Sequence, residues 1–305
     1  MKSKIKNKKF SERMFIFSLI FYPMLLFCVF YVYVNFNSII MAFQKIDMAG
    51  KATFVGLENF KSFMSQLLTD NPYLKISFIN SLKMYFINLI ICVPLYILFG
   101  YMLFKKCFLH KSIRLIVMIP QIVSGVLMCM VFLKFVDWVI PDIALRFFGK
   151  ETFPNLMRDG RYAFGMTIFY SVWTSFSTSL IVYPNAMNSI DPEIIEAGQI
   201  DGISNMFQEL WYIILPLIYP TFTTFLVTGF AGILSNAGPL TTFYLWNAPY
   251  ETYNMGYYYL VETAHVSEQS GYPVLAAGGL ILTILVAPAT NLLKWLLEKF
   301  GPEVE

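Results

Sequence analysis

The chain has 305 residues, of which 22 are Lys or Arg and 19 are Asp or Glu, so its formal net charge is +3. Only 13% of the residues are charged and 57% are hydrophobic, and the mean hydropathy is +0.60. The high hydrophobic content excludes a disordered or collagen-like chain. Soluble domains carry about 25% charged residues, so the low charge argues against a water-soluble enzyme. The four cysteines lie in or beside apolar runs without CxxC spacing, which predicts neither a disulfide framework nor a zinc site.

Six long windows of the sequence contain no Asp, Glu, Lys or Arg. Each can hold a helix of roughly 20 residues, the length that crosses the hydrocarbon of a bilayer. The predicted fold class is therefore an all-α integral membrane protein with six transmembrane helices. The first window is too long for the core of a signal peptide, so we expect it to stay in the chain as a signal anchor. The predicted spans cover, approximately, residues 14–36, 80–104, 113–134, 162–184, 213–240 and 271–294.

The distribution of Lys and Arg predicts the orientation of these spans, because basic residues in short loops resist translocation. The N-terminal segment 1–13 contains six of them, and the loop after the second predicted span contains four. Both segments are therefore expected in the cytoplasm. With six spans, the C-terminal tail 298–305 would be cytoplasmic as well.

The third predicted cytoplasmic segment, residues 185–212, does not follow the charge rule, since it contains no Lys or Arg and several acidic residues. Its local pattern predicts a short helix: Asp191 is a favourable N-cap, Pro192 suits the first helical position, and Gly202 can end the helix in the left-handed conformation. We expect a helix-turn-helix on the cytoplasmic face. The segment could be either a solvated surface helix or a docking surface.

A motif lies within this segment: Glu196-Ala197-Gly198, three further residues, Gly202, and later Ile213–Pro216. It resembles the cytoplasmic signature E-A-A-x3-G-x9-I-x-L-P of the permease subunits of binding-protein-dependent ABC importers. The sequence departs from that pattern at two points. The third motif position is Gly198 in place of Ala, and the stretch from Gly202 to Ile213 is one residue longer.

Further stretches narrow the resemblance to carbohydrate-importer permeases, of the kind that forms the first of two unlike membrane subunits. These are Phe54–Phe60 (FVGLENF), Asn80-Ser81-Leu82, Pro120 and Trp173. The resemblance covers about residues 14–297, and it implies the fold of a type I ABC importer permease with a cytoplasmic coupling helix. It also implies a multi-pass protein of a bacterial plasma membrane.

The resemblance implies that segment 185–212 docks into a cleft on a cytoplasmic ATPase and transmits its closure to the spans. The chain itself has no GxxxxGK[ST] phosphate loop, so it is expected to be non-catalytic and to bind no cofactor, with ATP and Mg held by the ATPase. The implied partners are a second, unlike permease, two ATPase subunits, an extracytoplasmic solute-binding protein, a carbohydrate and membrane lipid, without nucleic acid. The coupling residues would be Glu196, Ala197, Gly198, Asp201 and Gly202.

The fourth predicted span is unusually polar, and hydroxyl groups in hydrocarbon require partners on a neighbouring helix or water in a cavity. One helical face carries aromatic rings and hydroxyls together, a combination that suits a sugar. In the fifth span, small and hydroxylated residues recur at helical spacing. In both spans the alternative is ordinary helix packing. The candidate substrate-path residues are Tyr170, Trp173, Thr174, Ser177, Thr178, Thr228, Gly232, Ser235 and Asn236.

The sequence thus predicts a permease for a sugar or oligosaccharide. The main alternative is an ABC importer for another solute. A self-sufficient secondary transporter would need an ionisable relay or paired half-repeats, which the sequence does not show. The outer segments 45–75 and 247–268 could be docking surfaces for a sugar-binding protein, or an interfacial helix and a tyrosine belt at the lipid headgroups.

Overall fold

The computed structural model describes residues 2–47, 50–149, 152–265 and 271–302. The chain forms two compact units, which comprise Met1–Gln66 with His265–Thr283, and Leu67–Ala264 with Ile284–Glu305. The structure is helical apart from one two-stranded hairpin within the described residues. The predicted helical class is therefore confirmed.

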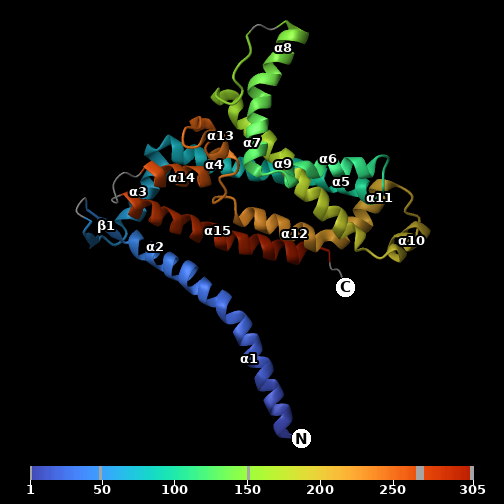
Figure 1. Ribbon diagram of the computed structural model, residues 1–305, viewed down its shortest axis with the longest axis horizontal. Coiled ribbons are helices and arrows are strands. Elements are labelled where there is room, and N and C mark those ends of the chain that lie inside the picture. Colours follow the sequence, from blue (N-terminus) through green and yellow to red (C-terminus); the bar gives the residue numbers. More distant parts are fainter. Residues whose placement is uncertain (1, 48–49, 150–151, 266–270, 303–305) are drawn as a thin grey trace. The chain divides into compact units, whose positions relative to one another are not determined.

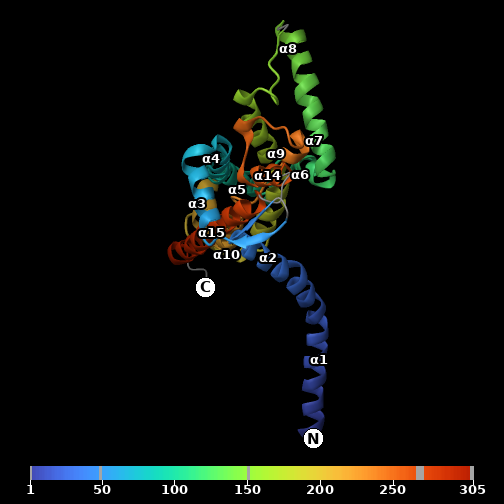
Figure 2. The same ribbon diagram turned by 90° about the vertical axis from the view of Figure 1, so that its left-hand side faces the viewer.

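The first unit begins with one helical run, which leads into a short antiparallel hairpin (Figures 1 and 2). The side chain of Asn59, from the stretch Phe54–Phe60, donates hydrogen bonds to the carbonyl groups of Ala42 at 2.9 Å and Gln44 at 2.8 Å. This buried amide ties the helix after the hairpin to the chain before it. The elements are α1 Lys2–Phe27, η1 Cys28–Tyr33, α2 Val34–Ala42, β1 Gln44–Ile46, β2 Ala52–Phe54 and α3 Glu58–Ser65, followed by η2 Gln66–Asp70.

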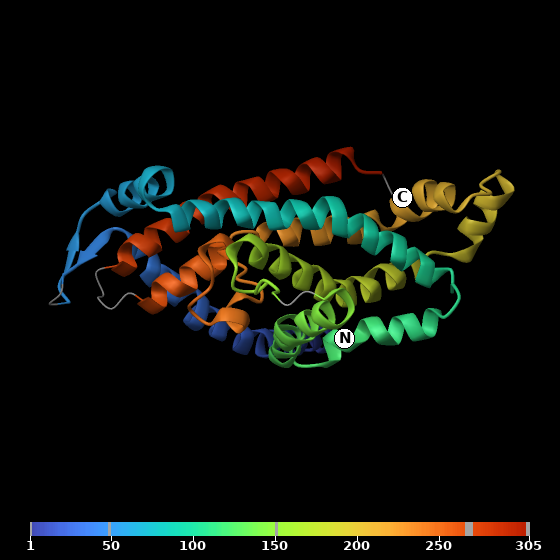
Figure 3. The ribbon, with the colours of Figure 1, turned by 90° about the horizontal axis from the view of Figure 1, so that it is seen from above.

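The second unit is built around α9, Gly160–Asn188, against which α5, Val93–Phe104, packs along much of its length (Figure 3). Asp159 caps the start of α9 by accepting a hydrogen bond from the Arg161 backbone at 3.1 Å. α5 continues the helical run of α4, Pro72–Ile87, and η3, Asn88–Cys92. Further along the chain, another helical run consists of α11 Met206–Glu209, η5 Leu210–Ile214 and α12 Leu215–Ala231. α12 also contacts α9.

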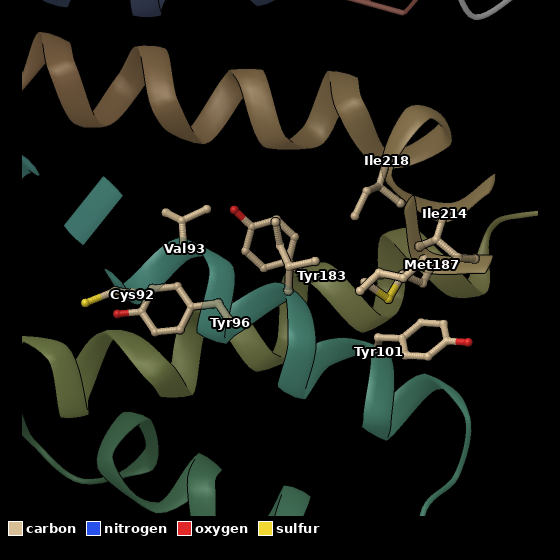
Figure 4. Packing of buried hydrophobic residues seen from close by; sticks show 10 residues of the cluster. Cys92, Val93, Tyr96, Tyr101, Tyr183, Met187, Ile214 and Ile218 are labelled. Carbon is tan, nitrogen blue, oxygen red and sulfur yellow. The ribbon is translucent and has the colours of Figure 1, made fainter. Parts of the chain in front are cut away.

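A cluster of buried side chains joins α5, α9 and the η5–α12 run (Figure 4). The rings of Tyr96 and Phe176 meet edge to face with 4.7 Å between their centroids. Tyr101, Met187 and Ile214 are almost completely buried nearby. Helices in a membrane associate through close van der Waals packing, and this cluster supplies such packing among the three helical runs.

The range predicted as the third span contains two helices, α6 His110–Ile122 and α7 Gly125–Lys134, with a bend of 104° between α6 and the run that α7 begins. Val123 and Ser124 adopt extended conformations at the bend. A Ser-Gly pair is a weak point for a helix, and Ser124-Gly125 lies where the helix breaks. η4 Phe135–Val139 and α8 Ile140–Phe148 extend α7, and Figure 2 shows α7 and α8 as one run.

Two buried polar residues of α4 form hydrogen bonds with the backbone just before α14 and at its first residue. The Asn80 side chain donates to the carbonyl groups of Glu251 at 2.7 Å and Tyr253 at 2.9 Å. The hydroxyl of Ser81 accepts a hydrogen bond from the Met255 backbone at 2.9 Å. The remaining elements are α10 Pro192–Ile200, α13 Leu240–Tyr244, η6 Tyr250–Thr252, α14 Met255–His265 and α15 Tyr272–Phe300.

Four helices are long and apolar enough to cross a membrane, and the bent pair gives a fifth candidate, among the residues that the structure describes. α9 has 29 residues, about 43 Å at 1.5 Å per residue, but its hydroxyl-rich sequence keeps it outside this set. The predicted number of six spans therefore stays a prediction. The four are Met14–Ala42, Pro72–Phe104, Met206–Ala231 and Tyr272–Phe300.

Candidate functional site

A cavity of about 560 Å³ lies within the second unit, among the α4–η3–α5 run, α9 and α12. Sites for small molecules commonly have volumes of roughly 300–1,000 Å³. Its polar lining consists of hydroxyl groups and amides, which lie beside aromatic rings and the apolar side chains of Met84, Leu89, Val93, Leu226 and Ile233. The lining includes Ser81, Tyr85, Asn88, Tyr96, Ser171, Ser175, Thr178, Ser179, Tyr183, Phe225, Thr228, Gly229, Gly232, Asn236 and Asn254.

One face of α9 supplies the hydroxyl groups of the cavity. Ser171, Ser175, Thr178 and Ser179 are spaced by four, three and one residues, and therefore lie on the same side of the helix. Thr178 also accepts a hydrogen bond from the Gln121 side chain of α6 at 2.8 Å. α9 thus presents a row of hydroxyls to the cavity, and α6 contacts one end of this row.

The other predicted residues of α9 do not line this cavity. Tyr170 is buried, where its hydroxyl accepts a hydrogen bond from the Cys129 thiol at 3.1 Å. The Trp173 ring lies 6.3 Å from the ring of Phe132, between centroids. Thr174 donates to the Tyr170 carbonyl of its own helix at 3.0 Å. Ser177 is buried and donates to the backbone carbonyl of Val117 on α6.

Three of the four residues predicted around the fifth span line the cavity, namely Thr228, Gly232 and Asn236, whereas Ser235 does not. Thr228 donates its hydroxyl to the carbonyl of Thr224, one turn earlier. α12 ends at Ala231, so Asn236 belongs to an irregular stretch beyond the helix.

A hydrogen bond and a close backbone contact fix the irregular stretch that carries Asn236. The Asn236 side-chain oxygen accepts a hydrogen bond from the Gly238 backbone at 2.8 Å, and Gly238 has a positive φ of 59°. A Cβ atom at Gly256 on α14 would overlap the backbone of Asn236 and Ala237. Only glycine at position 256 allows this close approach, which places Asn236 at the cavity.

Sequence reasoning missed several lining residues, among them Tyr85, Asn88, Tyr96, Ser175 and Ser179. The sequence contains an indication for Asn88, because it is an amide within the uncharged run 84–104. It contains another for the serines at 171, 175 and 179, since they recur at intervals of four residues. Both signals predict a polar face, but neither says what the face contacts.

The segment between α9 and α11 contains the second candidate site. α10 begins as the local pattern predicts: the Asp191 side chain accepts a hydrogen bond from the Glu193 backbone at 3.1 Å, and Pro192 is the first helical residue. At its end Gly202 has φ +98°, and the Ile203 backbone donates to the Gly198 carbonyl at 3.0 Å. This is the Schellman arrangement, in which a left-handed glycine closes the helix.

Four of the five predicted coupling residues, Glu196, Ala197, Asp201 and Gly202, are exposed. The fifth, Gly198, is half-buried, and a Cβ atom there would overlap the side-chain end of Ile213 on η5. η5 is a π-helical turn, which accommodates an additional residue in a helix. It falls within the stretch that is one residue longer than the expected spacing. The glycine and the π-turn together let η5 lie against α10.

α10 and α11 lie at one end of the second unit in Figure 3, where α9 ends and the η5–α12 run begins. The exposed segment is therefore covalently joined on both sides to helices that line the cavity.

Comparison with known proteins gives a family match over most of the chain. The family described as "binding-protein-dependent transport system inner membrane component" matches residues 74–305. The arabinooligosaccharides transport system permease protein of Bacillus subtilis is 25% identical over 208 residues, which are 66% of this chain and 63% of that protein. The polygalacturonan/rhamnogalacturonan transport system permease protein of the same organism is 27% identical over 205 residues, 64% of this chain and 61% of that protein.

The alignments thus span less than two thirds of the length of these two relatives. Among solved structures, a chain of a bacterial ABC transporter involved in the import of the acidic polysaccharide alginate has a TM-score of 0.77 and 19% identity. The match covers 97% of this chain and 99% of that chain. At this identity the likeness concerns the fold.

Proposed function

The chain belongs to the family of binding-protein-dependent transport system inner membrane components, and from this premise we propose that it is the membrane-spanning subunit of an ATP-driven importer for a sugar or oligosaccharide. The observation that carries the proposal is the connection of the exposed segment 191–202 to both α9 and α12, which line one cavity. The chain supplies a path and a coupling element, and it catalyses no reaction itself.

The chemistry of the cavity suits a sugar. Sugar hydroxyls both donate and accept hydrogen bonds, as do serine and threonine hydroxyls and asparagine amides. The apolar faces of sugar rings can rest on aromatic side chains such as Tyr85, Tyr96 and Tyr183. Five of the predicted path residues do not line this cavity, and we assign them to the parts of the chain that surround the path. They are Tyr170, Trp173, Thr174, Ser177 and Ser235.

The proposed route of energy runs through α10. Its exposed carboxylates and the open turn at Gly202 form a surface for a cleft on a cytoplasmic ATPase, which would hold ATP and Mg. Closure of two such ATPase subunits would displace α10. Because α10 continues into α9 and into the η5–α12 run, the displacement would open the cavity alternately to either side of the membrane.

The proposed assembly has six spans in this chain, with α9 added to the four apolar helices and the bent pair. Both termini would be cytoplasmic, following the basic residues of segment 1–13. The hydroxyl-rich face of α9 is then shielded from lipid by the cavity and by a second, unlike permease. An extracytoplasmic binding protein would deliver the sugar to the outer segments 45–75 and 247–268.

Affinity purification from the native membrane in mild detergent tests this function. Mass spectrometry of the co-purifying subunits should identify an ATPase, a second permease and a solute-binding protein. A known multisubunit complex of the same membrane, purified in parallel, controls for dissociation. Recovery of this chain alone, while the control complex stays intact, would contradict the proposal.

A further inference from the structure

The lining of the cavity is uncharged. Among the residues that the structure describes, no Asp, Glu, Lys, Arg or His contributes to it. The helices that form it are almost free of charge: α12 has no charged residue, and α9 has only Arg161, in its first turn. The α4–η3–α5 run has Lys75 and Lys83, neither of which lines the cavity.

An anionic substrate would gain no compensating charge in this cavity. Moving a carboxylate or phosphate out of water costs several kcal/mol unless a cation or several strong donors replace the lost hydration. Sites that bind such groups use arginine or lysine, which form charge-assisted hydrogen bonds. Hydroxyls and amides alone match neutral hydroxyl groups.

Some polar groups of the cavity are available for such hydrogen bonds. Within the described part of the chain, the Ser179 hydroxyl and the Asn236 amide nitrogen have no hydrogen-bond partner. The Tyr85 hydroxyl makes a long bond of 3.3 Å to the Leu226 carbonyl. The Tyr96 hydroxyl makes one of 3.4 Å to the Val172 carbonyl and also interacts with the side chains of Cys92, Ser175 and Asn88. Donors, acceptors and aromatic faces are therefore present without any formal charge.

We propose that the substrate is an uncharged glycan, and that this cavity discriminates against uronates and sugar phosphates. This inference rests on the proposed function and specifies its substrate class. Family membership leaves the charge open, since the names of the relatives include both arabinooligosaccharides and polygalacturonan. The charge-free lining decides between the two classes.

The test uses the complete purified complex in proteoliposomes, with ATP and the binding protein. Uptake is compared for matched glycans, galactotriose and trigalacturonate, which differ at C6 by a carboxylate in place of each hydroxymethyl group, and for a panel of further neutral oligosaccharides. We expect ATP-dependent uptake of a neutral glycan at least tenfold faster than of any anionic one. Faster or equal uptake of trigalacturonate would overturn the inference while leaving the importer function intact. Absence of ATP-dependent uptake for every glycan would overturn both.

Because the binding protein also selects its ligand, a pair of variants isolates the role of the cavity. Ser175→Arg places a cation in the lining, whereas Ser112→Arg places the same cation at an exposed position of α6 outside it. We expect Ser175→Arg to lower uptake of the neutral glycan about tenfold and Ser112→Arg to change it less than twofold. Equal uptake by the two variants at equal complex yield would contradict a role of the cavity in charge discrimination.

Discussion

The Nζ atom of Lys105, directly after α5, lies 2.5 Å from the Oε1 atom of Glu209, the last residue of α11. Glu209 is only 7% exposed, although it belongs to an otherwise exposed turn. The ammonium group of Lys105 also lies 5.8 Å from the ring centroids of Tyr101 and Phe104. This ion pair joins the end of α5 to the beginning of the η5–α12 run, next to the proposed coupling segment.

Removal of either charge of this pair should destabilise the second unit. Glu209→Gln leaves the ammonium group without its anion, and we expect a loss of about 1–2 kcal/mol. The value is below that of a fully buried pair because the Lys105 side chain is 37% exposed. A double-mutant cycle with Lys105→Ala, followed by thermal unfolding of the purified complex, measures the coupling. Lys111→Ala, in an exposed position, is the control, and additive effects would contradict the role of the pair.

Asn80 should be a structural residue of the second unit. Asn80→Ala leaves the carbonyl groups of Glu251 and Tyr253 without their donor, and the expected loss is about 2–3 kcal/mol. Asn80→Asp should be worse, because a carboxylate would face two carbonyl oxygens. Thermal unfolding checks both variants, with Lys75→Ala on the exposed side of α4 as the control. A loss no larger than that of the control would show that these hydrogen bonds contribute little.

A glycine should be required at position 198 because Ile213 packs against it, and not because of the conformation of α10. In Gly198→Ala, the added Cβ atom meets Cδ1 of Ile213, so we expect a loss of about 1–2 kcal/mol from overpacking. Ile213→Val removes that methyl group and should restore most of the stability in the double variant. Gly165→Ala on α9 is the matched control: its Cβ atom meets nothing within 4 Å, so it should stabilise by roughly 0.5–1 kcal/mol. A stabilising Gly198→Ala would contradict the close approach.

Gly202 should matter for coupling. Gly202→Asp adds a bulky anion at an open turn, and we expect normal membrane insertion with ATP-driven uptake reduced at least fivefold. Gly149→Asp, at the end of α8, is the control for backbone strain, since Gly149 also has a positive φ and open space around it. Uptake is measured in proteoliposomes at matched protein amounts. Normal uptake by Gly202→Asp would rule out the coupling role of this turn.

Local features of the sequence predicted local structure well. The start of α10 follows from Asp191 and Pro192, and its end from Gly202, because caps and left-handed turns depend on a few neighbouring residues. The helical class followed from composition and the long uncharged windows. The break at Val123–Ser124 was not predicted. It lies at the Ser124-Gly125 pair, whereas Pro120 stays within α6.

The rotation of α9 about its axis could not be derived from the sequence. Two of its faces carry hydroxyls, and the structure turns one with Ser171 and Ser175 toward the cavity, while Thr174 and Ser177 bond to backbone carbonyls. The choice depends on how α5, α6 and α12 pack against α9, which are contacts between distant parts of the chain. The irregular stretch after Ala231 depends likewise on Gly256 of α14.

We propose that α10 docks on an ATPase, and cross-linking from α10 is the direct test of this docking. A photoreactive amino acid is placed at Ala197, which is exposed on α10, and in a second preparation at Asn247, which is exposed beyond α13. Illumination of native membranes is followed by mass spectrometry of the cross-linked products. We expect a cross-link from position 197 to an ATPase subunit and none to an ATPase from position 247. A membrane that contains the assembled complex but yields no ATPase cross-link from position 197 would contradict it.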